Sequence, residues 1–153
     1  MIRVLFVCLG NICRSPMAEA VFRHRVKLAG LEDQIEADSA GTGDWHVGEP
    51  PHHGTARLLA DNQIEYDHCA RQLTARDLNH FDYIITMDEA NRRGVGRLGK
   101  GRARVAALLD YAPHARVAEV PDPYYTGNFE EVYHLVSQAA DGLLAAIREE
   151  HGL

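Results

Sequence analysis

The sequence predicts an α/β fold in which a four-stranded parallel sheet is covered by helices on both faces, giving three layers. Short runs rich in Val, Ile and Phe alternate along the chain with longer segments whose apolar residues recur every three or four positions. This alternation implies right-handed crossovers and a parallel sheet that is buried on both faces. The length of 153 residues suffices for one domain with a substantial core, and no repeat or linker divides the chain, so we expect a single domain over residues 1–153.

The composition excludes several classes of function. The chain is 46% hydrophobic and 25% charged, and its formal net charge of −6 argues against general binding to nucleic acids or anionic membranes. No segment approaches transmembrane length, and the N-terminal apolar run is too short for a signal peptide. The number of cysteines is odd, at three, which favours free thiols over a disulfide scaffold and predicts a cytoplasmic protein.

The first two predicted elements are a buried strand and the helix that follows it. Residues 2–7 form an apolar run that is typical of a central strand in a parallel sheet. Ser15 is the expected helix cap, and Pro16 fits the first helical turn. Gly30 is expected to end this helix. The apolar stripe of the helix contains Ala18, Val21, Phe22, Leu28 and Ala29.

The middle of the chain is predicted to contain short elements joined by one long loop. In order, we expect a strand over 35–39, a helix over 54–62, an irregular segment over 66–71, a helical turn over 74–77 and a strand over 82–87. The loop over 40–53 is dense in Gly, Pro and His, which indicates an exposed loop that carries function. Its histidines His46, His52 and His53 lack any recognised ligand spacing, so no metal site is expected.

The last third of the chain combines one ambiguous segment with one clear helix. Asp88 is expected to cap a helix towards Arg93, followed by a flexible basic loop that contains Gly94, Gly96, Gly99 and Gly101. Residues 104–109 form either a strand or a helical turn, because periodicity does not separate the two. Two prolines predict a rigid, non-helical segment over 120–128. The C-terminal helix is predicted from an apolar stripe at steps of three and four that comprises Phe129, Val132, Val136, Ala140, Leu143 and Ile147.

The stretch from Cys8 to Ser15 joins the first strand to the first helix and is the centre of the predicted site. A tight loop at the start of a helix presents converging backbone N–H groups, and the helix end adds partial positive charge. Cys8 stands at the carboxyl end of the first strand, where ligands bind in such folds, and Arg14 follows six residues later. A thiol beneath a bound oxyanion, with a guanidinium beside it, indicates a phosphate-ester hydrolase.

Activation of the thiol alone is too small an effect to explain catalysis. Lowering a thiol pKa by about 3 raises the thiolate population about thirtyfold at pH 7, at most ~2 kcal/mol, whereas enzymes typically supply ~8 kcal/mol or more. The loop is therefore expected to bind the phosphoryl group and stabilise its charge, and Ser15 is expected to hydrogen-bond the thiolate. The predicted phosphate-binding residues are Leu9, Gly10, Asn11, Ile12, Cys13, Arg14 and Ser15. A leaving group also needs a proton, for which Asp122 in its stiff, Pro-flanked segment is the best candidate, although composition alone favours Asp122 as a turn residue before proline.

Two segments of the chain resemble the low-molecular-weight protein tyrosine phosphatase family. The first is Val7-Cys8-Leu9-Gly10-Asn11-Ile12-Cys13-Arg14-Ser15-Pro16-Met17-Ala18-Glu19, and the second is Asp122-Pro123-Tyr124-Tyr125, where the family places its general acid. The resemblance implies hydrolysis of protein phosphotyrosine and small aryl phosphates without a metal or other cofactor. Cys8 would attack phosphorus while Asp122 protonates the departing tyrosine, and water activated by Asp122 would then release phosphate from the phosphocysteine.

Other positions resemble the family less specifically. Ser39 and His68 match residues that support the loop asparagine, here Asn11, in a strained backbone conformation. The aromatic residues that flank the substrate ring are matched by Trp45, Tyr124 and Tyr125. The implied partners are a phosphotyrosine-containing protein and a tyrosine kinase that supplies it, with no nucleic acid and no membrane.

Several alternatives are weighed against this interpretation. Thioredoxin-coupled arsenate reductases share the fold and the loop but need two further cysteines, and only Cys69 lies outside the loop. A branch that hydrolyses phosphoarginine typically has Thr where this chain has Ile12, which is better suited to an aryl ring. A silent phosphate-binding module would not need both a thiol and a remote acid, and a receiver domain would need an acidic pair after its first strand. A further hypothesis is that Cys13 protects Cys8 through a reversible disulfide.

Overall fold

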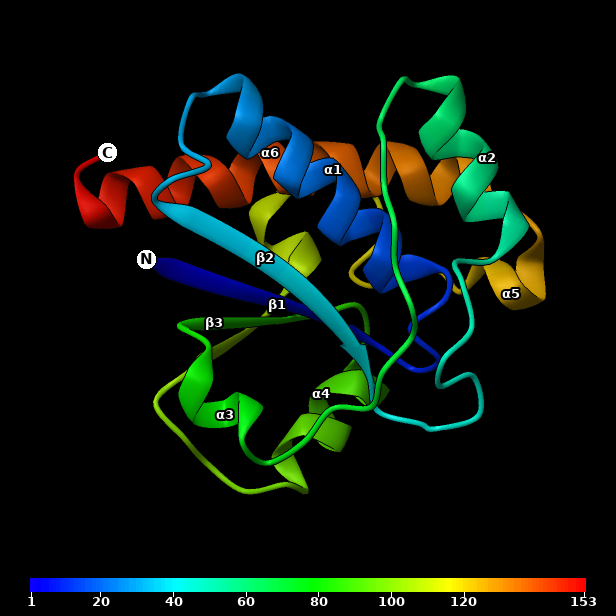
Figure 1. The fold of residues 1–153 in the computed structure, drawn as a ribbon, viewed down its shortest axis with the longest axis horizontal. Coiled ribbons are helices and arrows are strands. Elements are labelled where there is room, and N and C mark those ends of the chain that lie inside the picture. The colour runs from blue at the N-terminus through cyan, green and yellow to red at the C-terminus, as the bar shows by residue number, and fades with distance from the viewer.

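Four parallel strands in the order β2-β1-β3-β4 form the sheet at the centre of the computed structural model, which describes residues 1–153 (Figure 1). The strands are β1 (Ile2–Cys8), β2 (Ile35–Gly41), β3 (Tyr83–Thr86) and β4 (Arg104–Ala107). The helices are α1 (Arg14–Leu28), α2 (His53–Asp61), α3 (Asp77–His80), α4 (Glu89–Gly96), α5 (Pro123–Thr126) and α6 (Phe129–His151), with a 3-10 turn, η1 (Leu108–Tyr111). Helices α1, α2 and α6 pack together on one side of the sheet, and α3 and α4 lie on the other (Figure 1). The predicted three-layer α/β fold is confirmed.

Strand β1 supplies side chains to the cores on both sides of the sheet. Val4 and Phe6 belong to the large cluster with α1 and α6, whereas Leu5 and Val7 pack with residues of α3 and α4. All four side chains are fully buried, and therefore residues 4–7 are a continuous apolar run instead of alternating with polar residues.

The strand order reverses beside β1. The chain passes from β1 through α1 to β2 on one side and later places β3 on the other side of β1. In open α/β sheets, ligands bind beyond the carboxyl ends of the strands at such a point of reversal. The loop over residues 9–13 occupies this position, as the sequence predicts.

The two longest helices agree with the predicted stripes except at one end. Helix α6 buries Val132, Val136, Ala140, Leu143 and Ile147, while Phe129 is partly buried. In α1, however, Leu28 is 71% exposed, because burial decreases along this helix and its last turn lies at the surface. None of the helices combines the length and apolarity that a bilayer crossing requires.

Two predictions of irregular structure are wrong. Gly94 and Gly96 lie within α4 and not in a loop, because Asp88 begins this helix with a capping box that includes Asn91. The segment over 120–128 contains the short helix α5, in which Pro123 occupies the first turn and leaves no helical hydrogen bond unmade. Residues 104–109 divide between the two alternatives, a strand to Ala107 and then the start of η1.

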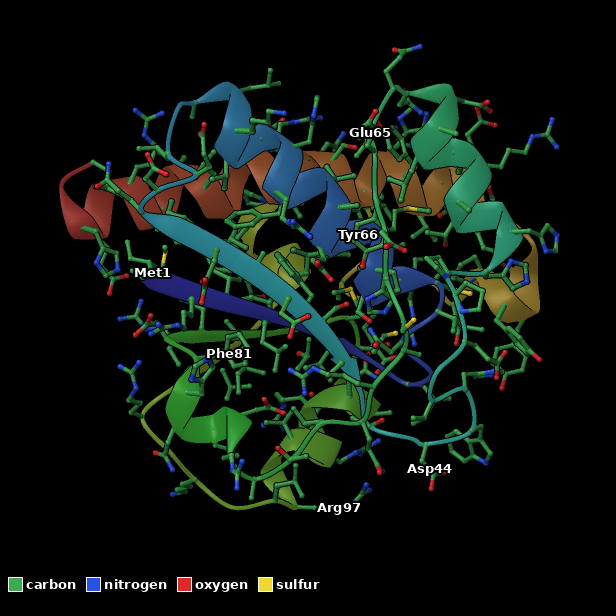
Figure 2. All side chains as sticks on the ribbon, in the orientation of Figure 1. Met1, Asp44, Glu65, Tyr66, Phe81 and Arg97 are labelled. Carbon is green, nitrogen blue, oxygen red and sulfur yellow. The ribbon has the colours of Figure 1, made fainter.

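An extended segment over residues 63–72 runs from the end of α2 to the end of β2 (Figure 1). Tyr66 lies against α1 and donates a hydrogen bond to Glu19 at 2.8 Å (Figure 2). Gly41 N donates to Arg71 O at 2.9 Å, which pairs the segment with β2. Gly41 also lies so close to the loop after β1 that a Cβ there would be 2.8 Å from Leu9 O. The segment is therefore held directly beside that loop.

Candidate active site

The loop after β1 directs its carbonyl groups outward and its N–H groups inward. Five carbonyls accept hydrogen bonds of 2.8 to 3.2 Å from other segments: Cys8 O from Thr42 N, Leu9 O from Gly43 N, Asn11 O from His68 Nε2, Ile12 O from His52 N and Cys13 O from Thr55 Oγ1. A trans peptide holds each C=O opposite to the N–H of the next residue, and the chain has no cis peptide. The N–H groups opposite these carbonyls belong to Leu9, Gly10, Ile12, Cys13 and Arg14. None of these five N–H groups donates to a backbone carbonyl.

These same five residues, together with Cys8, line a cavity of about 370 Å³. The N-terminus of α1 lies at its wall and adds the positive end of the helix dipole. Inward N–H groups at the start of a helix form a site for an anion such as a phosphate group. The predicted phosphate-binding loop therefore has the backbone geometry that this role requires.

Cys8 is almost completely buried, and its sulfur meets two polar groups. Ser15 Oγ lies 3.0 Å from Cys8 Sγ, and Asn11 N donates to the same sulfur at 3.3 Å. The predicted contact between Ser15 and Cys8 is confirmed, whereas the prediction of Ser15 as the helix cap is wrong. Helix α1 begins at Arg14 after Cys13, without a side-chain cap, so its first N–H groups stay free for a ligand.

Cys13 lies close to Cys8 in the sequence but has a different acid–base character. Burial raises its pKa to about 12, and the nearby charges of Cys8 and Asp122 act in the same direction. Cys13 therefore remains a thiol at neutral pH. The sulfur of Cys8, in contrast, lies beside Ser15 Oγ, the N–H of Asn11 and the start of α1.

Asn11 adopts the left-handed backbone conformation that the sequence predicts, with φ of 58°. Its side chain donates to Ser39 Oγ at 3.0 Å and to Ser15 Oγ at 2.9 Å. His68 Nε2 lies 3.0 Å from Asn11 Oδ1, on the opposite side of the amide. The structure thus brings Ser39 and His68 into contact with Asn11, and Ser39 in turn donates to the buried Glu19 at 2.7 Å.

Arg14 is buried and held by three groups from two distant segments. Its Nη1 donates to Asp88 Oδ2 at 2.7 Å and to Val120 O at 3.0 Å, while Nη2 lies 3.4 Å from Asp122 Oδ2. Burial opposes the charge of the guanidinium, but Cys8, Asp88 and Asp122 outweigh it and raise the pKa of Arg14 above its usual value. Arg14 is therefore a fixed cation at the wall of the cavity.

Asp122 and three aromatic residues surround the mouth of the cavity. Asp122 caps α5 by accepting the N–H of Tyr124 at 3.1 Å, which leaves Oδ2 beside Arg14. Trp45, Tyr124 and Tyr125 are largely exposed and line the same cavity. The ring of Trp45 lies over Gly43, where a Cβ would come within 1.9 Å of it.

Sequence reasoning missed two residues of this site. Asp88 was predicted only as a helix cap, yet it also forms the shortest hydrogen bond to Arg14. It directly follows Met87 beyond the carboxyl end of β3, the neighbour of β1, and this position was the available signal. The second missed residue, His46, lines the cavity and lies 2.9 Å from Glu49. No group of three or more His, Cys, Asp or Glu side chains is arranged to hold a metal ion.

A parallel α/β sheet with a thiol and an arginine in the loop after the first strand is the arrangement expected of a cysteine-dependent α/β phosphatase. Comparison with known proteins gives the family. Residues 3–152 match the family model described as low molecular weight phosphotyrosine protein phosphatase. The chain belongs to this family, as the resemblance of its two motifs implied.

Individual relatives cover essentially the whole chain. The chain is 52% identical over 156 residues to the low molecular weight protein-tyrosine-phosphatase YfkJ of Bacillus subtilis (strain 168), with 100% of both chains covered. The crystal structure of YfkJ matches with a TM-score of 0.95 over 98% of this chain and 96% of that one. The crystal structure of DARP, a Drosophila arginine phosphatase, matches with a TM-score of 0.89 at 31% identity over 95% and 97% of the two chains.

Proposed function

We propose that this protein hydrolyses phosphotyrosine in proteins, and small aryl phosphates, through a phosphocysteine intermediate and without a metal ion. One observation carries the proposal: the sulfur of Cys8 lies in a cavity lined by five inward N–H groups, with Arg14 and Asp122 beside it. The N–H groups and Arg14 would hold the phosphoryl oxygens, and their fixed dipoles and charge would stabilise the transferring group.

The proposed reaction has two steps. In the first, the Cys8 thiolate forms a bond to phosphorus as the bond to the tyrosine oxygen breaks, and Asp122 gives its proton to that oxygen. In the second, Asp122 takes a proton from water, which attacks phosphorus, and the bond to sulfur breaks to release phosphate and the thiolate. The exposed rings of Trp45, Tyr124 and Tyr125 would flank the aryl group of the substrate.

Hydrolysis of p-nitrophenyl phosphate in the presence of a metal chelator tests this proposal. We expect Cys8→Ser to lose activity by about 10³-fold or more, because a neutral hydroxyl replaces the thiolate. Cys69→Ser is the matched control, since Cys69 is exposed and lies outside the cavity, and it should retain the parent activity. Undiminished hydrolysis by Cys8→Ser would remove Cys8 as the nucleophile.

The similarity to an arginine phosphatase gives a specific reason to test a second substrate. Ile12 lines the cavity and packs against Ala70, which places an apolar, branched side chain beside the bound group. We expect kcat/KM to be higher for a phosphotyrosine peptide than for the matching phosphoarginine peptide, and Ile12→Thr to reduce that ratio. A higher kcat/KM for the phosphoarginine peptide would reverse the assignment.

The cellular setting follows from the same proposal. A phosphotyrosine substrate requires a tyrosine kinase that produces it. All three cysteines are free, including Cys69 at the surface, which supports a reducing compartment such as the cytoplasm.

A further inference from the structure

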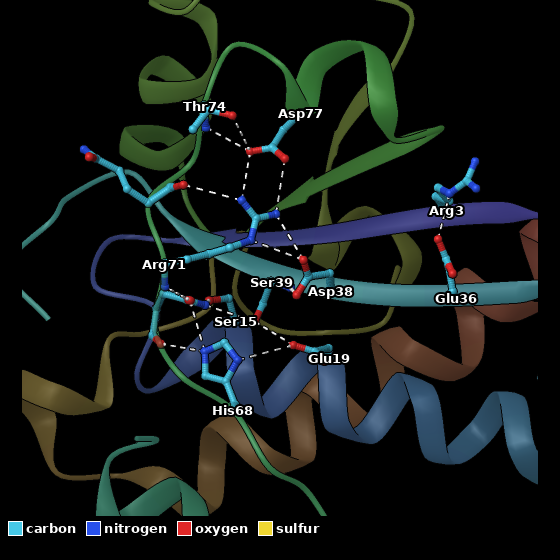
Figure 3. A network of polar contacts seen from close by, with 12 residues as sticks. Arg3, Ser15, Glu19, Glu36, Asp38, Ser39, His68, Arg71, Thr74 and Asp77 are labelled. Atoms are coloured by element: carbon cyan, nitrogen blue, oxygen red, sulfur yellow. Dashed lines mark hydrogen bonds and ion pairs between the residues drawn. The ribbon is translucent and has the colours of Figure 1, made fainter. Parts of the chain in front are cut away.

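We infer that Arg71 is a positioning residue that orients Asn11 and, through it, the hydroxyl group that serves the Cys8 thiolate. The inference rests on the proposed role of Cys8 as the nucleophile. Arg71 lies in the extended segment beside β2 and does not line the cavity (Figure 3). Its backbone N–H donates to Asn11 Oδ1 at 3.0 Å.

This contact determines which way the amide of Asn11 faces. A backbone N–H only donates, so the atom that Arg71 meets is the amide oxygen, and the amide nitrogen faces Ser15 and Ser39. Because Asn11 donates to Ser15 Oγ, Ser15 keeps its own proton for the sulfur of Cys8 at 3.0 Å. With the amide reversed, Ser15 would face an oxygen and would donate to Asn11 instead of to the thiolate.

The side chain of Arg71 holds its backbone in this place by bridging two carboxylates (Figure 3). Nε and Nη2 donate to Asp38 Oδ2 at 3.2 and 3.1 Å, and Nη1 and Nη2 donate to the two oxygens of Asp77 at 3.1 and 3.2 Å. Asp38 belongs to β2 and Asp77 begins α3, so one side chain ties the extended segment to two separate elements. Burial opposes the charge, but the hydrogen bond with Asp77 and the charge of Asp38 raise the pKa of Arg71 above its usual value.

Both carboxylates are themselves held by backbone groups. Asp38 Oδ1 accepts the N–H of Ser39 at 2.8 Å, and Asp77 Oδ2 accepts the N–H of Thr74 at 2.9 Å. Since Ser39 also accepts from Asn11, the contacts of Arg71 reach Asn11 from both sides of its amide. His68 supplies a second donor to the same amide oxygen, so loss of the Arg71 guanidinium should loosen the orientation without abolishing it.

Arg71→Met tests the inference, because it keeps the backbone N–H and the apolar stem while removing the guanidinium. We expect the pH midpoint for alkylation of Cys8 by iodoacetamide to rise by roughly half a pH unit or more. We expect kcat for p-nitrophenyl phosphate to fall roughly tenfold, with KM changed less than about threefold. Arg71→Lys should restore the alkylation midpoint and kcat only in part, because an ammonium group lacks the planar fork that bridges two carboxylates.

The matched control is Arg104→Met, which removes a two-bond pair with Glu150 at the opposite end of the sheet. It should leave the alkylation midpoint and kcat unchanged. All measurements are made where circular dichroism shows the variant folded, and Arg71→Lys carries the test if Arg71→Met does not fold. An unchanged alkylation midpoint in the folded Arg71 variant would overturn the inference.

A double-mutant cycle distinguishes the proposed route from a general loosening of the loop. If Arg71 acts through Ser15, Arg71→Met should shift the alkylation midpoint much less in a Ser15→Ala background than in the parent protein. Equal shifts in the two backgrounds would exclude this route. Alkylation requires no hydrolysis, so failure of this inference can be told apart from failure of the proposed function.

Discussion

The residues between β1 and α1 are held in different ways at two positions, Asn11 and Arg14. Around Asn11, the contacts are a set of oriented hydrogen bonds with Ser39, His68 and Ser15 that leads to the sulfur of Cys8. Around Arg14, they are a carbonyl and two carboxylates, from Asp88 and Asp122, on a buried cation. Under the proposed mechanism, this difference predicts a division of tasks, in which the Asn11 side would tune the reactivity of Cys8 and the Arg14 side would serve anion binding and proton transfer.

The largest effect in this comparison is expected on the Arg14 side, from Asp122→Ala. Loss of the acid should slow phosphotyrosine turnover by ~10²–10⁴, because the departing oxygen then leaves without a proton. The loss should be smaller for p-nitrophenyl phosphate, whose leaving group departs readily unprotonated. Steady-state kinetics over a series of aryl phosphates measures this dependence, and an equal loss across the series would show that Asp122 is not the acid.

A second effect on the same side is expected from Asp88→Ala. Arg14 would lose its shortest hydrogen bond and the carboxylate that orients it, so kcat/KM should fall by about 10- to 100-fold. The inhibition constant of orthophosphate should rise in parallel, since the same guanidinium binds the free anion. Orthophosphate inhibition equal to that of the parent would mean that Asp88 does not orient Arg14 for anion binding.

A smaller effect is expected on the Asn11 side, from Ser39→Ala. This variant removes one of the two acceptors for Asn11 Nδ2 and the link to Glu19, so kcat should fall by roughly 3- to 10-fold as the donor to the thiolate loosens. Inhibition by orthophosphate should change by less than about twofold. If Ser39→Ala and Asp88→Ala change kcat and orthophosphate inhibition in the same proportion, the Asn11 side and the Arg14 side do not divide the tasks.

The smallest effect is expected at Cys13, which lies between Asn11 and Arg14. Its pKa is raised from 9.0 to about 12. Between these two pH values an ordinary thiol loses its proton, whereas Cys13 keeps its proton. At pH 7, mass spectrometry of the Cys69→Ser protein should find iodoacetamide on Cys8 and not on Cys13. Cys13→Ala should change kcat by less than about threefold. Labelling of both residues at similar rates would contradict the assigned protonation states.

Sequence patterns predicted the elements that a single short stretch of the chain specifies. The apolar run of β1, the stripe of α6 and the loop between Cys8 and Ser15 are each specified within a short stretch of sequence. Predictions failed where a rule was applied outside its context. Proline was taken to exclude helix over 120–128, although Pro123 is tolerated in a first turn, and Ser15 was assigned by its type to a capping position that lies two residues earlier.

The sequence by itself determined the α/β class and the family, and it predicted a thiol, a guanidinium and a remote carboxylate as the reacting groups. Only the tertiary structure decided which residues contact this site from distant segments: Asp88 contacts Arg14, and Arg71 with its two carboxylates contacts Asn11. The physical reason is that parallel strands bring their carboxyl ends to one edge of the sheet, so residues 60 or more positions apart meet there. The hydrogen bonds between these residues depend on the tertiary arrangement of the strands, so no short stretch of the sequence predicts them.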